Sequence, residues 1–217
     1  MHLKRNKIGK FWTIPRKGTK YLAVSTHNKH SAVPLVVVAR DILKIVKNKK
    51  ELKRLLNEKQ ILINYKQIKE TNFPIGLFDV FSLPLAKKNY QAILSENKKI
   101  IFKEVTDKES EKRIFKVMSK KVLSNQKIQM NLSNGKNILS KEKVNTGDSV
   151  LLNLKNNKIE KIIPMEKGKN AFVIQGKHAG SAGKIEEISQ IGDKKIAKLS
   201  FKNSKINVWI KNLIVIE

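Results

Sequence analysis

The sequence predicts an α+β protein that is mostly β-sheet and is built from several small parts. Helical periodicity is confined to residues 34–58, where apolar side chains recur every three or four positions. Beyond residue 60 the chain alternates short apolar runs with turns rich in Asn, Gly and Lys, which is the pattern of short strands. A chain of 217 residues has room for one large domain or for two to three small ones.

The chain is strongly basic. It contains 46 basic and 18 acidic residues, a net charge of +28, and its first acidic residue is Asp41. The many positive charges repel one another. This excess of charge persists most readily when a polyanion, most commonly nucleic acid, neutralises it. Only five of the cations are Arg, so Lys dominates, which favours neutralisation of phosphates over reading of bases. Genome composition alone explains the Lys content equally well.

Residues 1–33 lack regular periodicity and are predicted to form an extended basic arm. Phe11, Trp12 and Tyr21 are interleaved with the cations, and aromatic rings beside cations suit stacking on exposed bases. The alternative is that Trp12 and Tyr21 anchor the arm on the protein's own surface. Because the arm has few apolar residues and an uncompensated charge, we expect it to be disordered without RNA.

Two helices are predicted next. The first begins at Pro34, whose fixed φ suits a first helical turn. Its buried face consists of Leu35, Val38, Ile42 and Ile45 or Val46, and a second face carries Arg40, Lys44 and Lys47. Asn48 and Glu51 resemble a capping box that starts a second helix, which runs to about Glu58. Its apolar face has Leu52, Leu55 and Leu56, and its polar face includes Lys53 and Arg54.

A strand at residues 61–64, a turn at 64–67 and the segment FPIGLFDVFSLP (73–84) follow. Asp79 is surrounded by apolar residues in this segment. A buried carboxylate can be catalytic, but no second acid lies near in the sequence, so we expect Asp79 to be structural.

Short strands are predicted from residue 87 to residue 164, in NYQAILS, KKIIFKEV, DSVLLNL and KIEKIIP. Residues 166–217 are predicted to form a compact unit. Gly176, Gly180 and Gly183 there permit positive φ and the tight turns of a small barrel. They do not form a phosphate-binding P-loop, because the Gly-Lys-Ser/Thr ending before a helix is missing.

Several functional classes find no support. With no Cys and four His, the sequence offers no thiolate zinc site and no disulfide framework. The acidic residues between 104 and 111 alternate with Lys and suggest a solvated short helix rather than a metal site. The apolar runs are too short to cross a bilayer, and no signal peptide is recognisable. We therefore expect a cytoplasmic protein that is not an enzyme, with no cofactor, metal, membrane or small-molecule substrate, and that is not a homo-oligomer.

These blocks, in this order, closely resemble the S-four-e family of small-ribosomal-subunit proteins of archaea and eukaryotes. HLKR (2–5) with Trp12 resembles the family's N-terminal segment, and LVVVARDILK (35–44) with FPIGLFDVFSL (73–83) resembles its S-four-type RNA-binding module. GDSVLLNL (147–154) resembles a strand of its central domain. The segment 172–188 resembles a KOW motif, which belongs to SH3-like barrels of translation and transcription proteins.

The resemblance implies four parts: a basic N-terminal extension (1–33), an RNA-binding module of two helices plus strands (34–84), a central β domain (85–165) and a C-terminal SH3-like, KOW barrel (166–217). It also implies a structural protein that binds rRNA beside neighbouring ribosomal proteins. A departure is Asn64-Tyr65-Lys66, where the family usually has an Asp-Gly-Lys turn. Tyr65 could instead offer its ring to RNA.

The residues expected to contact RNA combine the basic arm, the two helices, the turn after the first strand and the glycine-bearing segment. They are Lys4, Arg5, Lys7, Lys10, Trp12, Arg16, Lys17, Lys29, His30, Arg40, Lys44, Lys47, Lys53, Arg54, Tyr65, Lys66, Lys177, His178 and Lys184. Two other functions stay open at this stage: a free RNA chaperone or translation regulator built from the same modules, and an RNA-modifying enzyme. The enzyme would need a catalytic domain that the central region does not suggest.

Overall fold

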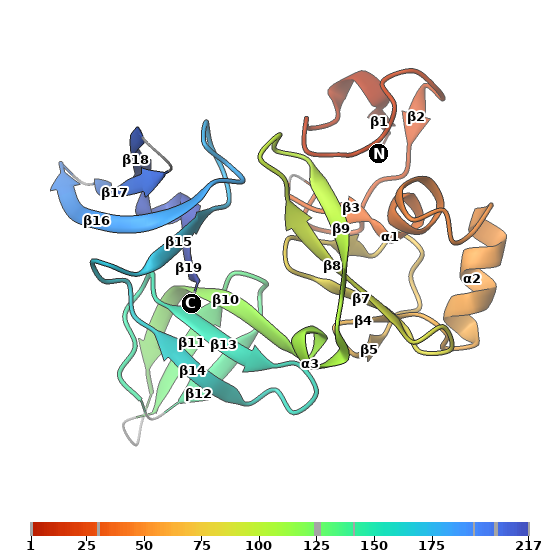
Figure 1. Cartoon of the computed structure of the whole chain (residues 1–217). Helices are drawn as coiled ribbons and strands as arrows, with labels where there is room; N and C mark the ends of the chain where they lie inside the picture. The colour runs from red at the N-terminus through yellow and green to blue at the C-terminus, as the bar shows by residue number, and fades with distance from the viewer. Residues whose placement is uncertain are drawn as a thin grey trace. The chain divides into compact units, whose positions relative to one another are not determined.

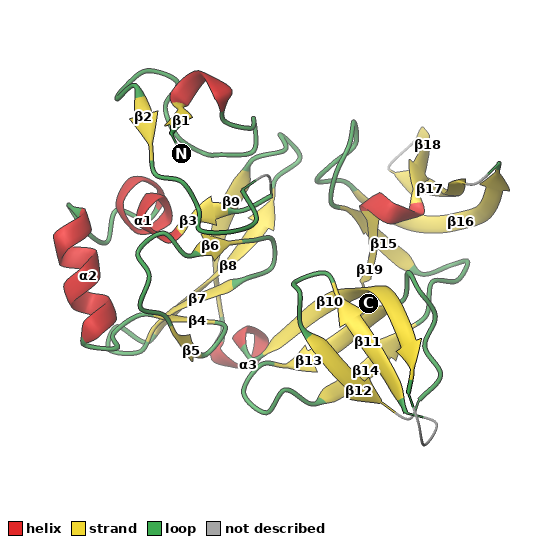
Figure 2. Cartoon of the chain, turned by 180° about the vertical axis from the view of Figure 1, so that it is seen from behind, coloured by secondary structure: helices red, strands yellow, loops and turns green. Residues whose placement is uncertain are grey.

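The computed structural model describes residues 2–29, 31–123, 127–140, 142–192, 194–201 and 204–216. The chain forms two compact units, Met1–Glu111 and Lys112–Glu217 (Figures 1 and 2). Each contains mostly antiparallel strands with few and short helices, as the sequence predicted.

The N-terminal unit is organised around one five-stranded sheet, in the order β5-β4-β7-β8-β9. Its strands are β4 (Leu62–Ile63), β5 (Lys66–Gln67), β7 (Val80–Leu83), β8 (Lys88–Leu94) and β9 (Ile100–Val105). Two small pairs accompany it: β1 (Leu3–Lys4) with β2 (Tyr21–Leu22), and β3 (Val33–Pro34) with β6 (Pro74–Ile75). The helices are α1 (Leu35–Val37), α2 (Lys49–Asn57) and α3 (Asp107–Ser110). The predicted boundary after residue 84 falls inside the β7–β8 hairpin of this sheet.

The helix after Pro34 is shorter than predicted. It comprises α1 and one π-helical turn, Val38–Ile42. Pro34 precedes it in an extended conformation. Leu35 to Ala39 are buried without interruption, because the core surrounds this part of the helix, whereas Arg40, Asp41 and Ile42 at its end are half-buried. Lys44 follows the helix with φ of 54°, so the prediction that Arg40, Lys44 and Lys47 share one helical face was wrong.

The second helix matches its prediction. Asn48 caps α2, and its side-chain oxygen accepts a hydrogen bond from the backbone N–H of Glu51 at 3.0 Å. The Glu51 carboxylate accepts from the backbone N–H of Lys47 at 2.7 Å, one residue before the cap rather than at the cap itself. Leu52 and Leu56 are buried in the core of the N-terminal unit.

The N-terminal segment is folded onto the core and does not form an extended arm. Trp12 is only 5% exposed and belongs to the core cluster. The backbone N–H of Ile100, in β9, donates to the carbonyl of Phe11 at 2.8 Å, and the Thr13 hydroxyl donates to the carbonyl of Ile100. The alternative of an anchoring aromatic therefore holds for Trp12, whereas Tyr21 is 48% exposed.

The turn between β4 and β5 explains Asp79. Asn64 and Tyr65 have φ of 52° and 60°, as a tight two-residue hairpin requires. Asn64 donates from Nδ2 to Asp79 Oδ1 at 2.6 Å and accepts from the backbone N–H of Val80 at 3.0 Å. Asp79 Oδ2 accepts from the backbone N–H of Gly76 at 2.5 Å. These bonds hold Tyr65 in a conformation that otherwise favours glycine, and Asp79 fixes two turns.

The C-terminal unit contains two five-stranded sheets, ordered β12-β11-β10-β13-β14 and β18-β17-β16-β15-β19. The strands of the first are β10 (Lys112–Val122), β11 (Ile128–Leu132), β12 (Asn137–Ser140), β13 (Ser149–Asn153) and β14 (Ile159–Ile163). Those of the second are β15 (Asn170–Val173), β16 (Ala182–Ile191), β17 (Lys194–Phe201), β18 (Ser204–Trp209) and β19 (Leu213–Ile216). A 3₁₀ turn, Ile210–Asn212, leads into β19.

A buried lysine joins the two sheets of this unit. Lys116 in β10 is 4% exposed. Its Nζ donates to the carbonyls of Leu213 at 2.8 Å and Lys211 at 3.1 Å, and also to that of Ile210. Nearby, the Val215 backbone N–H donates to the Ser149 hydroxyl at 2.9 Å. Burial lowers the pKa of Lys116 to about 8, because desolvation penalises its charged form.

The glycines of the C-terminal unit have different roles. Gly176 and Gly180 have φ of 106° and 93°, as predicted for a tight loop. Gly183 instead lies in β16, followed by Lys184, and its φ is not positive, so the prediction that Gly183 serves a tight turn was wrong. At Gly183 a Cβ would collide with the backbone carbonyl of Ser200 in β17, so glycine is needed there for close strand approach.

Candidate nucleic-acid interface

Several cations of the N-terminal unit line two neighbouring hollows on its surface. The larger, here called the Arg40 hollow, has a volume of about 800 Å³. Its lining comes from the N-terminal segment, the first helix, the start of α2 and the loop before β6. The cations among the lining residues are Arg5, Lys17, Arg40, Lys44 and Lys49, and Asp41 is the acid among them.

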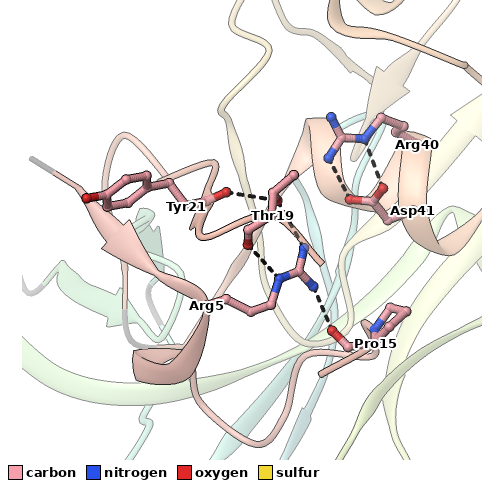
Figure 3. Close-up of polar contacts among 6 residues, drawn as sticks. All are labelled: Arg5, Pro15, Thr19, Tyr21, Arg40 and Asp41. Atoms are coloured by element: carbon pink, nitrogen blue, oxygen red, sulfur yellow. Dashed lines mark hydrogen bonds and ion pairs between the residues drawn. The ribbon is translucent and has the colours of Figure 1, made fainter. Parts of the chain in front are cut away.

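Arg5 builds one wall of the Arg40 hollow. Its guanidinium donates to the carbonyls of Thr19 at 2.8 Å and Pro15 at 2.6 Å, and to the Thr19 hydroxyl at 3.1 Å (Figure 3). Gly18 packs against it, since a Cβ at Gly18 would lie 2.7 Å from Arg5 Nη2. These bonds hold loop 15–19 in place, so Arg5 has a structural role in the site.

Arg40 is oriented by its neighbour in the sequence. Its Nε and Nη2 donate to the two carboxylate oxygens of Asp41, each at 2.9 Å (Figure 3). The hydrogen bond to Asp41 raises the pKa of Arg40. The pair fixes the guanidinium plane and leaves its far edge, with Nη1, for an outside acceptor.

The smaller hollow, here called the Arg16 hollow, has a volume of about 370 Å³ and shares Arg5, Gly18 and Thr19 with the larger one. Its other lining residues are Lys4, Asn6, Arg16 and Lys20. The structure thus brings together six of the predicted residues, Lys4, Arg5, Arg16, Lys17, Arg40 and Lys44, from three stretches of chain.

Other predicted residues do not join these hollows. Trp12 is buried and cannot stack on a base. Tyr65 is half-buried, with its hydroxyl bonded to Ser110. Arg54 pairs with Glu58 on α2 at 2.7 Å, a bond that raises the pKa of Arg54. Exposed positions outside both hollows are Lys7, Lys10, Lys29, Lys47, Lys53 and Lys66, and His30 lies outside the described residues.

The three predicted residues of the C-terminal unit occupy two kinds of position. Lys177 is exposed and His178 half-buried in the loop after β15, whereas Lys184 is exposed on β16.

Sequence reasoning missed two cations that line the hollows, Lys20 and Lys49. Lys49 is the first residue of α2. Both cations are visible in the sequence, but nothing in it indicates that their side chains line the hollows.

Fold and surface define a class: basic α+β proteins, mostly β, suited to assembly with a polyanion. The profile described as "Ribosomal family S4e" matches residues 86–159. The chain is 32% identical to "Small ribosomal subunit protein eS4" of Nanoarchaeum equitans, over 98% of this chain and 94% of that protein. It is 35% identical to the protein of that name from Methanospirillum hungatei, over 86% and 79% of the two chains.

The crystal structure of the 30S ribosomal protein S4e from Thermoplasma acidophilum has the same fold, with a TM-score of 0.74, 21% identity, and coverage of 86% of this chain and 95% of that one. The chain belongs to the eS4 family of small ribosomal subunit proteins, as the sequence motifs predicted. This is a family of structural, non-enzymatic proteins. Within the described residues, no helix is long and apolar enough to span a membrane.

Proposed function

We propose that this protein is a structural constituent of the small ribosomal subunit that binds and stabilises rRNA through phosphate contacts. The observation that carries the proposal is the gathering of cations from three stretches of chain around the two hollows of the N-terminal unit. The names of the relatives support the ribosomal setting. The protein then acts in the cytoplasm, beside other ribosomal proteins, as a single copy rather than a homo-oligomer.

The four predicted parts keep distinct roles in this proposal, and the basic N-terminal extension (1–33) supplies Arg5, Arg16 and Lys17 to the two hollows. Residues 34–84 form the S-four-like RNA-binding module, with β8 and β9 completing its sheet. Residues 85–165 include the central β domain. Residues 166–217 form the KOW, SH3-like barrel, supported by five consecutive antiparallel strands around a small core. Lys177, His178 and Lys184 extend the rRNA contacts to this part.

Salt titration tests the phosphate contacts. A protein that neutralises about 6–10 phosphates loses roughly 10³- to 10⁵-fold in affinity between about 50 and 200 mM salt. We expect filter binding with small-subunit rRNA fragments to show this loss. A triple variant, Lys17→Gln, Lys44→Gln and Lys49→Gln, should bind more weakly with a shallower salt dependence.

The matched control carries the same charge change outside the hollows, as Lys69→Gln, Lys98→Gln and Lys99→Gln, all at exposed positions. It should keep most of the wild-type affinity. A flat salt response, or equal losses for the two triple variants, would contradict the proposal. Stoichiometric co-sedimentation with small subunits separates this function from that of a free RNA chaperone or translation regulator, which would not co-sediment in that way.

A further inference from the structure

The Arg40 hollow has an apolar floor that phosphate binding does not require. The floor consists of four lining residues: Ile14, Leu22 and Ala23 are half-buried, and Val36 is 3% exposed. Phosphates need only exposed cations, as the flexible Lys side chains elsewhere on this unit provide. An apolar surface inside a ring of cations suits a ligand that is flat and apolar on one part and anionic on another.

The rim supplies the complementary groups. Lys17, Lys44 and Lys49 are exposed point charges at the edge of the hollow, and Arg40 is held in one orientation by Asp41. Asn72 also lines the hollow, and an amide can both donate to and accept from the edge of a base. The hollow has a volume of about 800 Å³ and is open to solvent, so an RNA strand can approach it.

We infer that the Arg40 hollow takes one unpaired nucleotide of an RNA strand, with its base against the apolar floor and the flanking phosphates on the lysines. This inference rests on the proposed function and names the form of RNA bound at that site. A double helix cannot fill the floor, because its bases are stacked inside and its major groove is too deep and narrow for side chains. An unpaired base offers a free ring face and free edges.

The hollow is formed before RNA arrives. Three hydrogen bonds from Arg5 hold loop 15–19, and Gly18 leaves the room that the guanidinium needs (Figure 3). A preformed wall lowers the ordering cost of binding. Tyr21 also lines the hollow, but its ring points away from Arg40 (Figure 3), so we place the base on the floor rather than on this ring.

The test introduces a larger apolar side chain at the floor of the hollow without changing the net charge of the protein. Ala23→Leu places extra carbon atoms in the hollow, and Ala86→Leu, at an exposed turn position, is the matched control. The probes are a single-stranded RNA of about ten nucleotides, within the size range of single-strand sites, and a duplex of the same sequence, both measured by filter binding at one salt concentration. Circular dichroism checks that each variant folds.

We expect Ala23→Leu to weaken binding of the single strand about tenfold, as loss of one base contact does. Duplex binding by this variant, and binding of both RNAs by the control, should change by no more than about twofold. An unchanged single-strand affinity, or an equal loss for both RNAs, would overturn the inference.

Crosslinking of the wild-type protein to RNA tests the inference independently of any variant. Single-stranded RNA carrying 4-thiouridine should crosslink on irradiation to peptides containing residues 14–23 or 36–49. Crosslinks confined to other peptides would overturn the inference even if RNA binding remained strongly salt-dependent, which leaves the proposed function standing. Absence of salt-dependent binding to any RNA would instead remove the proposed function.

Discussion

Lys116 donates to three backbone carbonyls around the start of β19, and burial lowers its pKa from 10.5 to about 8. Between these two values the unfolded chain binds more protons at this residue than the folded one, so stability increases as pH rises. We expect the free energy of unfolding to gain up to about 3 kcal/mol from Lys116 between pH of about 8 and 10.5. Urea unfolding across this pH range measures it.

The other lysines also lose charge in this range and reduce self-repulsion, so a control is needed. Lys121→Met removes an exposed lysine from the same strand and should keep the rise in stability. Lys116→Met should lose the part of this rise in stability that comes from the buried amine. If the two variants showed the same pH dependence, the buried ammonium would not be the cause.

Asp79 accepts hydrogen bonds from Gly76 and Asn64 and is 8% exposed. Asp79→Asn would turn one accepting oxygen into a donor facing another donor. We expect a loss of about 1–3 kcal/mol in unfolding free energy, measured by urea unfolding. Glu104→Gln, at an exposed position of β9, makes the same change of charge and should stay within about 0.5 kcal/mol of the wild type. A wild-type stability for Asp79→Asn would refute the structural role.

At the scale of elements, α2 depends on its first turn. Asn48 satisfies the backbone N–H of Glu51, and the helix buries only Leu52 and Leu56 fully. We expect Asn48→Ala to destabilise the N-terminal unit by about 1 kcal/mol, as loss of an N-cap does. Asn57→Ala, at the exposed last residue of α2, is the matched change and should have little effect. Thermal unfolding followed by circular dichroism compares them, and equal effects would argue against the cap.

The sequence predicted the elements whose signal is local. α2 was found from its cap and leucine spacing, and β8, β9, β13 and β14 were found from apolar runs between turns. The first helix was overestimated, because a run that is buried on every side carries no periodicity to mark its end. The sequence left open whether Trp12 stacks on RNA or anchors the N-terminal segment, since its core position depends on Ile100, which is distant in the sequence.

The candidate site was predictable only in part. Charge alone selected Arg16 and Lys17, and a helical face that the structure does not contain selected Lys44; the structure brings all three to the hollows. Charge could not show that Arg5 fastens a loop, because its partners are mostly backbone carbonyls that leave no trace in a sequence. The pairing of Arg54 is different, because Glu58 four residues later was a visible sign of an ion pair.

At the scale of the whole molecule, the net charge of +28 opposes compactness. Raising NaCl from about 0.1 to 1 M shortens the Debye length from about 10 to 3 Å. We therefore expect the melting temperature of the free protein to rise by several degrees, at roughly 2–4 °C per kcal/mol, while its affinity for RNA falls. The Lys17, Lys44 and Lys49 to Gln variant should show a smaller rise. A melting temperature that fell with NaCl would contradict self-repulsion.

The unequal burial of the two tryptophans gives each unit its own spectroscopic signature. Trp12, in the N-terminal unit, is 5% exposed, and Trp209, in the C-terminal unit, is 49% exposed. Emission from Trp12 should therefore be blue-shifted and shielded from iodide, whereas Trp209 should emit at longer wavelength and be quenched readily. With no other tryptophan in the chain, the unfolding of the two units can be followed separately by intrinsic fluorescence, without any label.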